Sequence, residues 1–205
     1  MEVEGLVAYS DFDLKTALRT FGLVEERNRD LFSAVEPIEP SPPLVDWLAE
    51  VGPVALGINT EKAKSESIIF PILTEAKRRA GPPVNVLSGV AFDVDRAAGL
   101  SGFCDFLIAR SEEFYYIQAP IVAVVEAKKE DLIAGLGQCA AEMAAIRLFN
   151  EREQSPTPAV HGCVTSGTNW RFLKLQDQTL SIDRVEYYLA EVAKILGILV
   201  SVIRE

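Results

Sequence analysis

The sequence predicts an α/β fold, because strand-like segments alternate with helical ones along most of the chain. The strand-like segments are compact and rich in apolar and β-branched residues. They are residues 84–94, 100–109, 121–128, 158–165 and 170–175. An alanine-rich helical segment, residues 131–150, separates the third strand from the fourth. This order predicts at least one strand–helix–strand crossover and therefore an α/β sheet.

The N-terminal part of the sequence predicts short helices and a connector rather than strands. Short helices are expected within residues 1–36, where apolar residues recur at helical spacing. Residues 36–43 contain four prolines, and we expect a stiff extended connector there because proline fixes φ and lacks an N–H donor. The predicted division is a helical arm with its connector, residues 1–50, followed by a main domain, residues 51–205.

Two further helices are expected in the main domain. The first spans residues 60–80, with basic residues in its last turn, a kink at Pro71 and a stop at Gly81. The last spans residues 184–203 and is apolar over much of its surface, so it either packs in the core or forms a homodimer face.

Charge and cysteine usage narrow the class of protein. The 205 residues include 30 acidic and 20 basic side chains, a net charge of −10, which disfavours binding nucleic acid by bulk attraction. Three widely spaced cysteines without a C-x-x-C pair favour a reducing compartment. The start of the chain does not resemble a signal peptide, and the stretch Ile195–Ile203 is too short to span a bilayer. We therefore expect a cytoplasmic protein without a membrane partner.

Three charged side chains interrupt the apolar strands. Side chains alternate between the faces of a strand, so Glu126 and Lys128 share one face and lie roughly 7 Å apart. Asp105 is the acidic residue of the apolar segment 100–109. Glu126 follows Asp105 by 21 positions, which is enough for a hairpin that would bring the aspartate, the glutamate and the lysine together at one end of the sheet.

Such a group suits hydrolysis of a phosphodiester. Two neighbouring carboxylates repel each other and stay ionised most easily with a divalent cation between them. Oxygen ligands favour a hard ion, Mg²⁺ or Mn²⁺. A lysine beside them can hold a phosphate, orient a water or stabilise negative charge in the transition state.

Two more polar residues are candidates for the same site. Glu66 recurs at helical spacing with Ala63 and Phe70, so we expect it in an apolar stripe, although an exposed charged face is an alternative. Gln138 lies on the helix after Lys128, among small residues that allow close approach of backbone or ligand. An exposed or core glutamine is the alternative there.

Asp105 followed by Glu126-Ala127-Lys128, with Glu66 upstream and Gln138 downstream, resembles the PD-(D/E)XK nuclease superfamily. The resemblance covers roughly residues 55–180. The chain as a whole is similar to uncharacterised cyanobacterial-type members of this superfamily. It implies a restriction-endonuclease-like, three-layer α/β/α fold with a central mixed sheet, after a short helical N-terminal arm. Cysteine stands before Asp105 where the motif has proline, a position that varies within the superfamily.

The resemblance also implies roles for these residues. Asp105 and Glu126 would be metal ligands, Glu66 the helix acid that joins them, and Lys128 the catalytic lysine. Gln138 would be the helix glutamine found in the branches like Holliday-junction resolvases. The implied protein is a Mg²⁺- or Mn²⁺-dependent nuclease acting on nucleic acid, with DNA as the expected substrate.

Competing interpretations remain open. The net charge favours, as an alternative, a non-catalytic binding or assembly module that keeps the nuclease fold.

Residues 135–140 match the dinucleotide pattern G-x-G-x-x-A but lie inside a predicted helix rather than at a strand–helix turn. His161 is the only histidine, which disfavours histidine-based zinc sites and serine hydrolases. Residues 170–174 alternate aromatic and basic side chains, so a structural strand or a nucleic-acid contact is possible.

Overall fold

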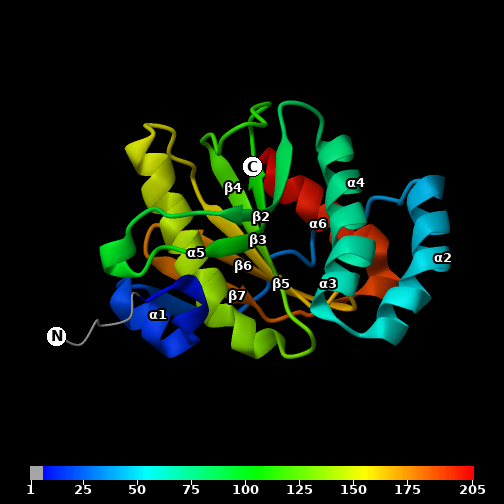
Figure 1. Ribbon diagram of the computed structural model, residues 1–205, viewed down its shortest axis with the longest axis horizontal. Helices are drawn as coiled ribbons and strands as arrows, with labels where there is room; N and C mark the ends of the chain where they lie inside the picture. The colour runs from blue at the N-terminus through cyan, green and yellow to red at the C-terminus, as the bar shows by residue number, and fades with distance from the viewer. Residues whose placement is uncertain (1–6) are drawn as a thin grey trace.

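The computed structural model describes residues 7–205 and contains a mixed eight-stranded sheet with helices on both faces (Figure 1). The strand order is β1-β7-β6-β5-β4-β3-β2, and β8 pairs with β6. The strands are β1 (Val24–Arg29), β2 (Asn85–Ala91), β3 (Phe103–Ala109), β4 (Ile121–Ala127), β5 (Val160–Thr165), β6 (Asn169–Gln176), β7 (Thr179–Asp183) and β8 (Tyr187–Tyr188). This arrangement confirms the predicted α/β class with a central mixed sheet.

The helices form a layer on each side of the sheet. The α-helices are α1 (Leu14–Thr20), α2 (Pro42–Ile58), α3 (Glu61–Lys64), α4 (Phe70–Ala80), α5 (Leu132–Arg152) and α6 (Val192–Arg204). Short turns are η1 (Tyr9–Asp11), η2 (Ser65–Ile69), η3 (Arg96–Ala98) and η4 (Leu189–Glu191). Helices α1 and α5 cover one face, and α4 and α6 cover the other, with α2 packed against α3, η2 and α4 (Figure 1).

Strands β3 and β4 form the predicted hairpin, and the predicted crossover follows it along the chain. Strands β3 and β4 pair antiparallel, with Phe106 opposite Val125. Strand β4 then pairs parallel with β5, and α5 forms the connection between them. Every residue of β4 is buried because the strand lies in the middle of the sheet between two helix layers.

The single helix expected over residues 60–80 is three segments. Helix α3 continues into the π-helical turn η2 and then into α4, which begins at Phe70 and places Pro71 in its first turn. A proline is tolerated there because the first N–H groups of a helix have no intrahelical acceptor. The buried stripe contains Ile68 and Ile69, so Glu66 does not share it. The expectation of a buried Glu66 is therefore wrong.

The N-terminal arm is part of the same sheet and core. Strand β1, which the sequence did not predict, pairs parallel with β7 at the edge of the sheet. Helix α2 begins at Pro42 within the expected connector, because prolines fit the first helical turn. The predicted boundary at residue 50 lies inside α2.

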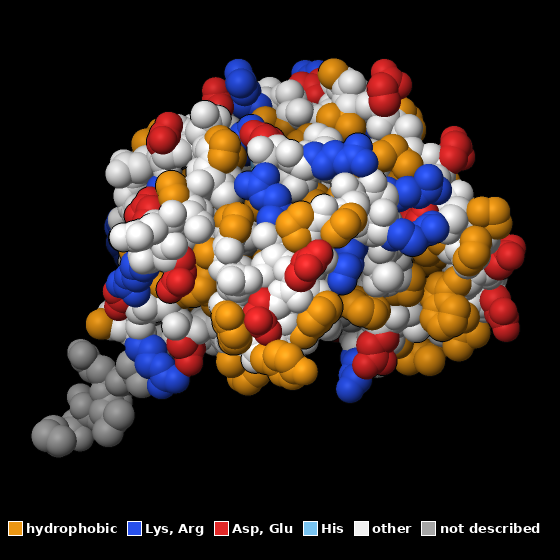
Figure 2. Space-filling model, turned by 90° about the horizontal axis from the view of Figure 1, so that it is seen from above, with side chains coloured by type: hydrophobic (Ala, Val, Ile, Leu, Met, Phe, Trp, Pro, Cys, Tyr) orange, Lys and Arg blue, Asp and Glu red, His pale blue; other side chains and the backbone are white. Residues whose placement is uncertain are grey.

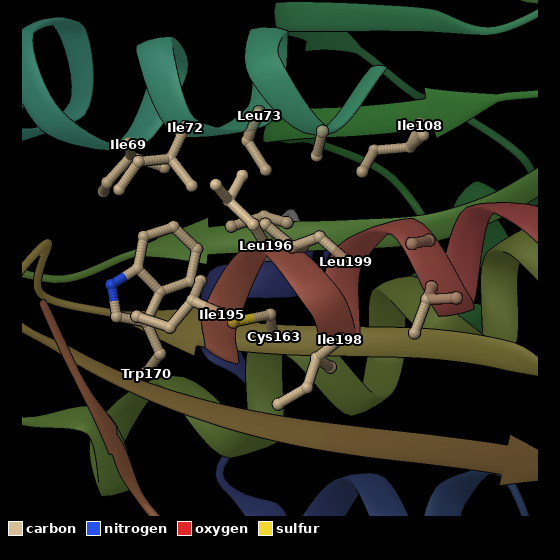
Figure 3. Packing of buried hydrophobic residues seen from close by; sticks show 14 of the residues in the cluster. Ile69, Ile72, Leu73, Ile108, Cys163, Trp170, Ile195, Leu196, Ile198 and Leu199 are labelled. Atoms are coloured by element: carbon tan, nitrogen blue, oxygen red, sulfur yellow. The ribbon is translucent and has the colours of Figure 1, made fainter. Parts of the chain in front are cut away.

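The C-terminal helix is shorter than expected and faces inward. It begins at Val192 rather than at residue 184, because residues 187–188 form β8 and residues 189–191 form the turn η4. Its apolar residues, including Leu196 and Leu199, pack against α4 and the sheet (Figure 3). Of the two alternatives for this helix, core packing is therefore what the structure shows, and the apolar face expected for a homodimer is buried within the chain.

Helix α5 is also a core helix. Within residues 7–205 it is the one helix that is long and apolar enough to cross a membrane, but 72% of its most apolar window is buried inside the fold. The helix lies between the sheet and the segment that leads into α1: a Cβ atom on Gly137 would lie 2.2 Å from the backbone of Asp13. Its small residues therefore serve close packing.

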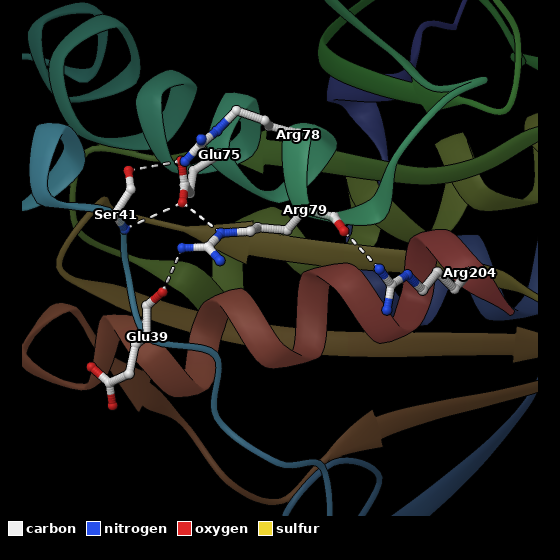
Figure 4. Close-up of polar contacts among 6 residues, drawn as sticks. All are labelled: Glu39, Ser41, Glu75, Arg78, Arg79 and Arg204. Atoms are coloured by element: carbon white, nitrogen blue, oxygen red, sulfur yellow. Dashed lines mark hydrogen bonds and ion pairs between the residues drawn. The ribbon is translucent and has the colours of Figure 1, made fainter.

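A buried carboxylate joins α2 to α4. Glu75 of α4 is 6% exposed and accepts hydrogen bonds from the backbone N–H and hydroxyl of Ser41 and from Arg78 and Arg79 (Figure 4). Burial alone would raise the pKa of Glu75, but the hydrogen bonds from Arg78, Arg79 and Ser41 lower it below its ordinary value. Arg79 also donates to the carbonyl of Glu39, so the start of α2 is held on α4.

Replacing this carboxylate should destabilise the fold. We expect Glu75→Gln to lower the free energy of unfolding by about 1.5–3 kcal/mol at pH 7, since charge-assisted hydrogen bonds are lost. The pKa of Glu75 is depressed in the folded state, so this contribution is present above the unfolded pKa and is lost as pH falls through the folded pKa. Urea unfolding at pH 7 and pH 3 measures both effects.

The matched control is Glu151→Gln, at a carboxylate whose side chain is 57% exposed and 4.0 Å from Arg147. Its free energy of unfolding should stay within about 0.5 kcal/mol of the parent value. Equal effects of the two substitutions would show that the Glu75 contacts do not stabilise the protein.

Candidate functional site

Asp105 and Glu126 lie side by side on adjacent strands. Continuing the β3–β4 register from Phe106 and Val125 places Asp105 opposite Glu126. The carboxylate of Asp105 accepts a 2.8 Å hydrogen bond from the backbone N–H of Ala127 through Oδ2, which fixes it beside the end of β4. Glu126 is 2% exposed. The hairpin thus brings together the two acids that the sequence singled out.

Lys128 lies between Glu126 and Gln138. Its Nζ donates to Glu126 Oε1 at 2.6 Å and to Gln138 Oε1 at 2.9 Å. The backbone N–H of Lys128 donates to the carbonyl of Thr165, which holds the residue at the end of the parallel β4–β5 pair. Four of the five predicted site residues, from β3, β4 and α5, therefore lie in one group: Asp105, Glu126, Lys128 and Gln138.

The sequence analysis missed Glu142, which extends this group into the core. Gln138 Nε2 donates to Glu142 Oε1 at 3.1 Å, and Glu142 is fully buried. Burial, with the neighbouring charge of Glu126, raises the pKa of Glu142 well above its ordinary value, so the neutral acid is favoured. Its position one helical turn after Gln138, in an apolar run, was the available signal.

The electrostatics of Glu126 are unusual for a carboxylate. Burial first, and then repulsion from Asp105, raise its pKa to about 7, although Lys128 opposes the shift. Among the residues that the structure describes, Glu126 Oε2 has no hydrogen-bond partner. The pKa of Lys128 is raised: burial lowers it, but the carboxylate of Glu126 outweighs that effect. The site therefore holds one firmly protonated amine and an incompletely compensated acid.

Glu61, not Glu66, is the helix acid whose charge acts on this group. Glu61 opens α3, and its pKa is raised by partial burial and by repulsion from Asp105, with Lys128 opposing the shift. Glu66 lies in the next turn with a side chain that is 67% exposed and 3.8 Å from Lys62. Residues five positions apart lie about 140° apart around a helix, so Glu61 and Glu66 cannot both face this group. Thr60 caps α3, so Glu61 lies in its first turn, whereas the side chain of Glu66 points to solvent.

Two packing contacts hold these elements in place. The buried Lys64 of α3 donates from Nζ to the carbonyl of Lys129 at 2.8 Å, which ties α3 to the loop after β4. On α5, a Cβ atom on Gly135 would lie 2.6 Å from Val164 Cγ1 and 3.1 Å from the side chain of Lys128. The glycine is required there so that the helix can lie against the lysine.

Asp105 and Glu126 are the residues of this group that could hold a hard cation. Among residues 7–205, no three acidic, cysteine or histidine side chains are grouped as a ready-made metal centre. Mg²⁺ is commonly held by one or two carboxylates, with water and phosphate oxygens completing its shell. Asp105 and Glu126, with the unpartnered Glu126 Oε2, provide such a pair. A cation there would also relieve the repulsion that raises the pKa of Glu126.

Other sequence candidates lie outside this group. The glycines of the G-x-G-x-x-A pattern are inside α5 and serve packing. His161 is buried, and its Nε2 is 3.0 Å from Glu205 Oε2, while burial lowers its pKa to about 4. Trp170 and Phe172 are buried in the core, so the aromatic side chains of that strand have a structural role.

The pKa of Glu126 predicts a pH-dependent stability of the metal-free protein. Between pH 4.5 and about 7 the folded state keeps a proton that the unfolded state has lost, so stability falls as pH rises. Relative to Glu126→Gln, the parent should lose about 3 kcal/mol of unfolding free energy across this window. Urea unfolding from pH 4.5 to pH 8, in the presence of a chelator, measures this difference.

Comparing the two proteins at each pH removes the contribution of His161, which has the opposite sign. Its pKa is lowered in the folded state, so protonating it at low pH destabilises both proteins alike. A control, Glu66→Gln, should leave the pH profile of the parent unchanged, since that side chain is exposed. A difference between parent and Glu126→Gln that does not vary with pH would contradict the prediction.

The contact at Gly135 predicts a cost for a single methyl group. Gly135→Ala should destabilise the fold by about 1–3 kcal/mol, because Val164 or Lys128 must move to admit the Cβ atom. Gly57→Ala in α2 is the matched control: nothing lies within 4 Å of its Cβ position, so it should stabilise by up to about 1 kcal/mol. Thermal unfolding measures both, and equal shifts would show that Gly135 is not closely packed.

The sequence matches no protein-family model, and comparisons with curated proteins and with solved structures found no significant match. The function proposed next is therefore argued from the geometry and electrostatics of the site.

Proposed function

We propose that this protein is a metal-dependent nuclease that hydrolyses phosphodiester bonds at the group formed by Asp105, Glu126 and Lys128. The observation that carries the proposal is the buried Glu126 carboxylate. One of its oxygens binds the Lys128 amine, and the other is buried without a hydrogen-bond partner among the described residues, opposite a second carboxylate. Leaving such an oxygen unsatisfied costs stability, so its retention favours a function.

Asp105 and Glu126 would hold the cation, Mg²⁺ or Mn²⁺, with Glu61 acting on it from α3. Bound there, a divalent ion would polarise the scissile phosphate and lower the pKa of an attacking water. Both carboxylates are fixed before any substrate arrives, Asp105 by the N–H of Ala127 and Glu126 by Lys128. Preorganised ligands lower the cost of assembling the site at the moment of reaction.

Lys128 is suited to act on the phosphate. An ammonium has three donors, and two of them bind Glu126 and Gln138. Its side chain is 23% exposed, so the third donor can reach a phosphate oxygen or a water at the surface. The raised pKa keeps the amine charged, as stabilising negative charge in the transition state requires. Gln138, held by Glu142, fixes the position of the ammonium.

The order of the elements supports the same proposal. A helix, a three-stranded antiparallel unit, a crossover helix and a parallel strand follow one another as α4, β2, β3, β4, α5 and β5. This is the order that a restriction-endonuclease-like fold would have, with acids on neighbouring central strands and a lysine two residues after the second acid. We propose that fold for residues 55–180.

A second candidate is a binding or assembly module that keeps this fold without cutting. The net charge of −10 favours it, and so does the acidity of the site itself, where Glu61 and Glu130 lie near the end of β4. A polyanion would meet repulsion there unless cations neutralised the acids. The two candidates therefore differ in whether the site takes up a metal and turns over a substrate.

Nuclease assays with purified variants test the proposal. Plasmid, single-stranded and branched DNA, and RNA, are incubated with Mg²⁺ or Mn²⁺, and cleavage is followed on gels. We expect metal-dependent cleavage that falls by about 100-fold or more in Lys128→Ala and in Asp105→Asn. Glu61→Gln should reduce the rate, whereas Glu66→Gln, one turn away and exposed, should match the parent.

Calorimetric titration with Mn²⁺ separates the two candidates. Binding in the parent that is lost in Asp105→Asn and Glu126→Gln would support the metal site. Metal binding without cleavage of any substrate would favour the module. Cleavage that persists equally in Lys128→Ala would indicate a contaminating nuclease, and absence of Mn²⁺ binding at millimolar concentration would overturn the proposed nuclease.

A further inference from the structure

Helix α2 has an apolar flank that nothing in the described chain covers. Trp47, Val54 and Ile58 lie on this flank with 45%, 59% and 59% of their surface exposed. Phe70 at the start of α4 is 40% exposed and lines the same groove as Trp47. We call these four residues the α2 flank. Hydrophobic side chains gather at the end of the molecule that α2 forms (Figure 2). A contiguous apolar surface of this kind on a folded chain is typical of an interaction site.

The core does not need this flank. Helix α2 packs on the rest of the chain through a different stripe, whose buried members are Leu44, Gly52 and Ala55. Their positions in the sequence place Trp47, Val54 and Ile58 on a side of the helix about 100° around its axis from that stripe. The helix therefore carries two apolar surfaces, of which the fold covers one.

A groove continues the α2 flank. It has a volume of about 550 Å³ and lies between α2 and α4. Its lining is mainly apolar and includes Leu44, Trp47 and Phe70, with Glu75 and Arg78 as its charged members. The Glu75 contacts hold both walls, and Trp47 Nε1 donates to the carbonyl of Ser67 at 2.8 Å, so the groove exists before any partner binds.

The charges around the groove are self-complementary. Helix α2 contains Asp46 and Glu50, both exposed, and no basic residue. The last turns of α4 carry three basic residues, and Arg78 lines the groove with a side chain that is 62% exposed. Glu75 also lines the groove and pairs with both Arg78 and Arg79, so these three side chains together keep one net positive charge. An acidic, apolar helix beside an apolar groove with net positive charge suits a two-fold symmetric contact, because each subunit then offers both halves.

We propose that the α2 flank and the α2–α4 groove form a homodimer interface, in which α2 of one copy lies in the groove of the other. Trp47 and Phe70 are the aromatic anchors, and Arg78 of each copy faces the acidic side of α2 of the other. This contact uses a different surface from α6, whose apolar residues are buried. It does not depend on the proposed nuclease activity.

Sedimentation velocity of the full chain over a micromolar concentration series tests the interface. The parent should show a concentration-dependent monomer–dimer equilibrium. Val54→Glu and Ile58→Glu should each raise the dissociation constant about tenfold or more, because both side chains are exposed in the monomer and buried in the dimer. Tyr115→Glu, in the loop between β3 and β4 and 96% exposed, is the control and should leave association unchanged.

Cross-linking gives a second readout that does not depend on weakening the contact. The three native cysteines are buried, so Val54→Cys introduces the one readily accessible thiol among the residues that the structure describes. A short bis-maleimide should link two copies of Val54→Cys but not of Tyr115→Cys. A parent that stays monomeric at every concentration would overturn the proposal. So would a dimer unaffected by the α2 substitutions, or one that links equally well through residue 115.

Discussion

The carboxylate of Glu126 is removed from water at the end of a wholly buried strand, and its compensation governs the arrangement of the surrounding elements. Lys128 lies on the same face as Glu126 and donates a hydrogen bond to its carboxylate. Gln138 of α5 accepts a second hydrogen bond from the same amine. Helix α5 can come this close because Gly135 has no side chain. The neutral Glu142 then orients the glutamine from within the core. Even so, one oxygen of Glu126 has no partner among the described residues, which is the property that a cation would satisfy.

Two buried carboxylates, one on each side of the sheet, have pKa shifts in opposite directions. Glu75, in the α4 layer, accepts hydrogen bonds from two arginines and a serine, and its pKa is lowered. Glu126, facing α5, has one amine for compensation and a second acid opposite, and its pKa is raised. The first carboxylate joins two helices and needs nothing more. The second is compensated incompletely within the described residues, and this difference is what the proposed cation site rests on.

The sequence predicted best where periodicity and neighbours agree. The β3–β4 hairpin, the α5 crossover and the β5–β6 turn lie close to their predicted positions, because each apolar run is short and is bounded by turn or capping residues. Prediction from the sequence was wrong where the same residue type is compatible with two different structures. The four prolines of residues 36–43 predicted an extended connector, and residues 36–41, with Pro37 and Pro40, do form no helix or strand. Pro42 and Pro43 instead open α2, since the first turn of a helix does not need their N–H groups. Likewise, both Glu61 and Glu66 fall within one helical segment, and only the packing of that segment shows that the charge of Glu61 acts on the site while Glu66 is exposed.

The sequence by itself determined the α/β class, the β3–β4 hairpin and the three charged side chains that meet at its end, because strand alternation and chain order fix which residues share a face. The tertiary structure decided what those side chains experience. Burial between two helix layers raises the pKa values of Glu126 and Glu142. The packing of α3 decides that Glu61 is the helix acid whose charge acts on Asp105 and Lys128. It also decided that α6 is covered while α2 carries an uncovered apolar flank. Desolvation and helix register depend on elements distant along the chain, so no local pattern could reveal them.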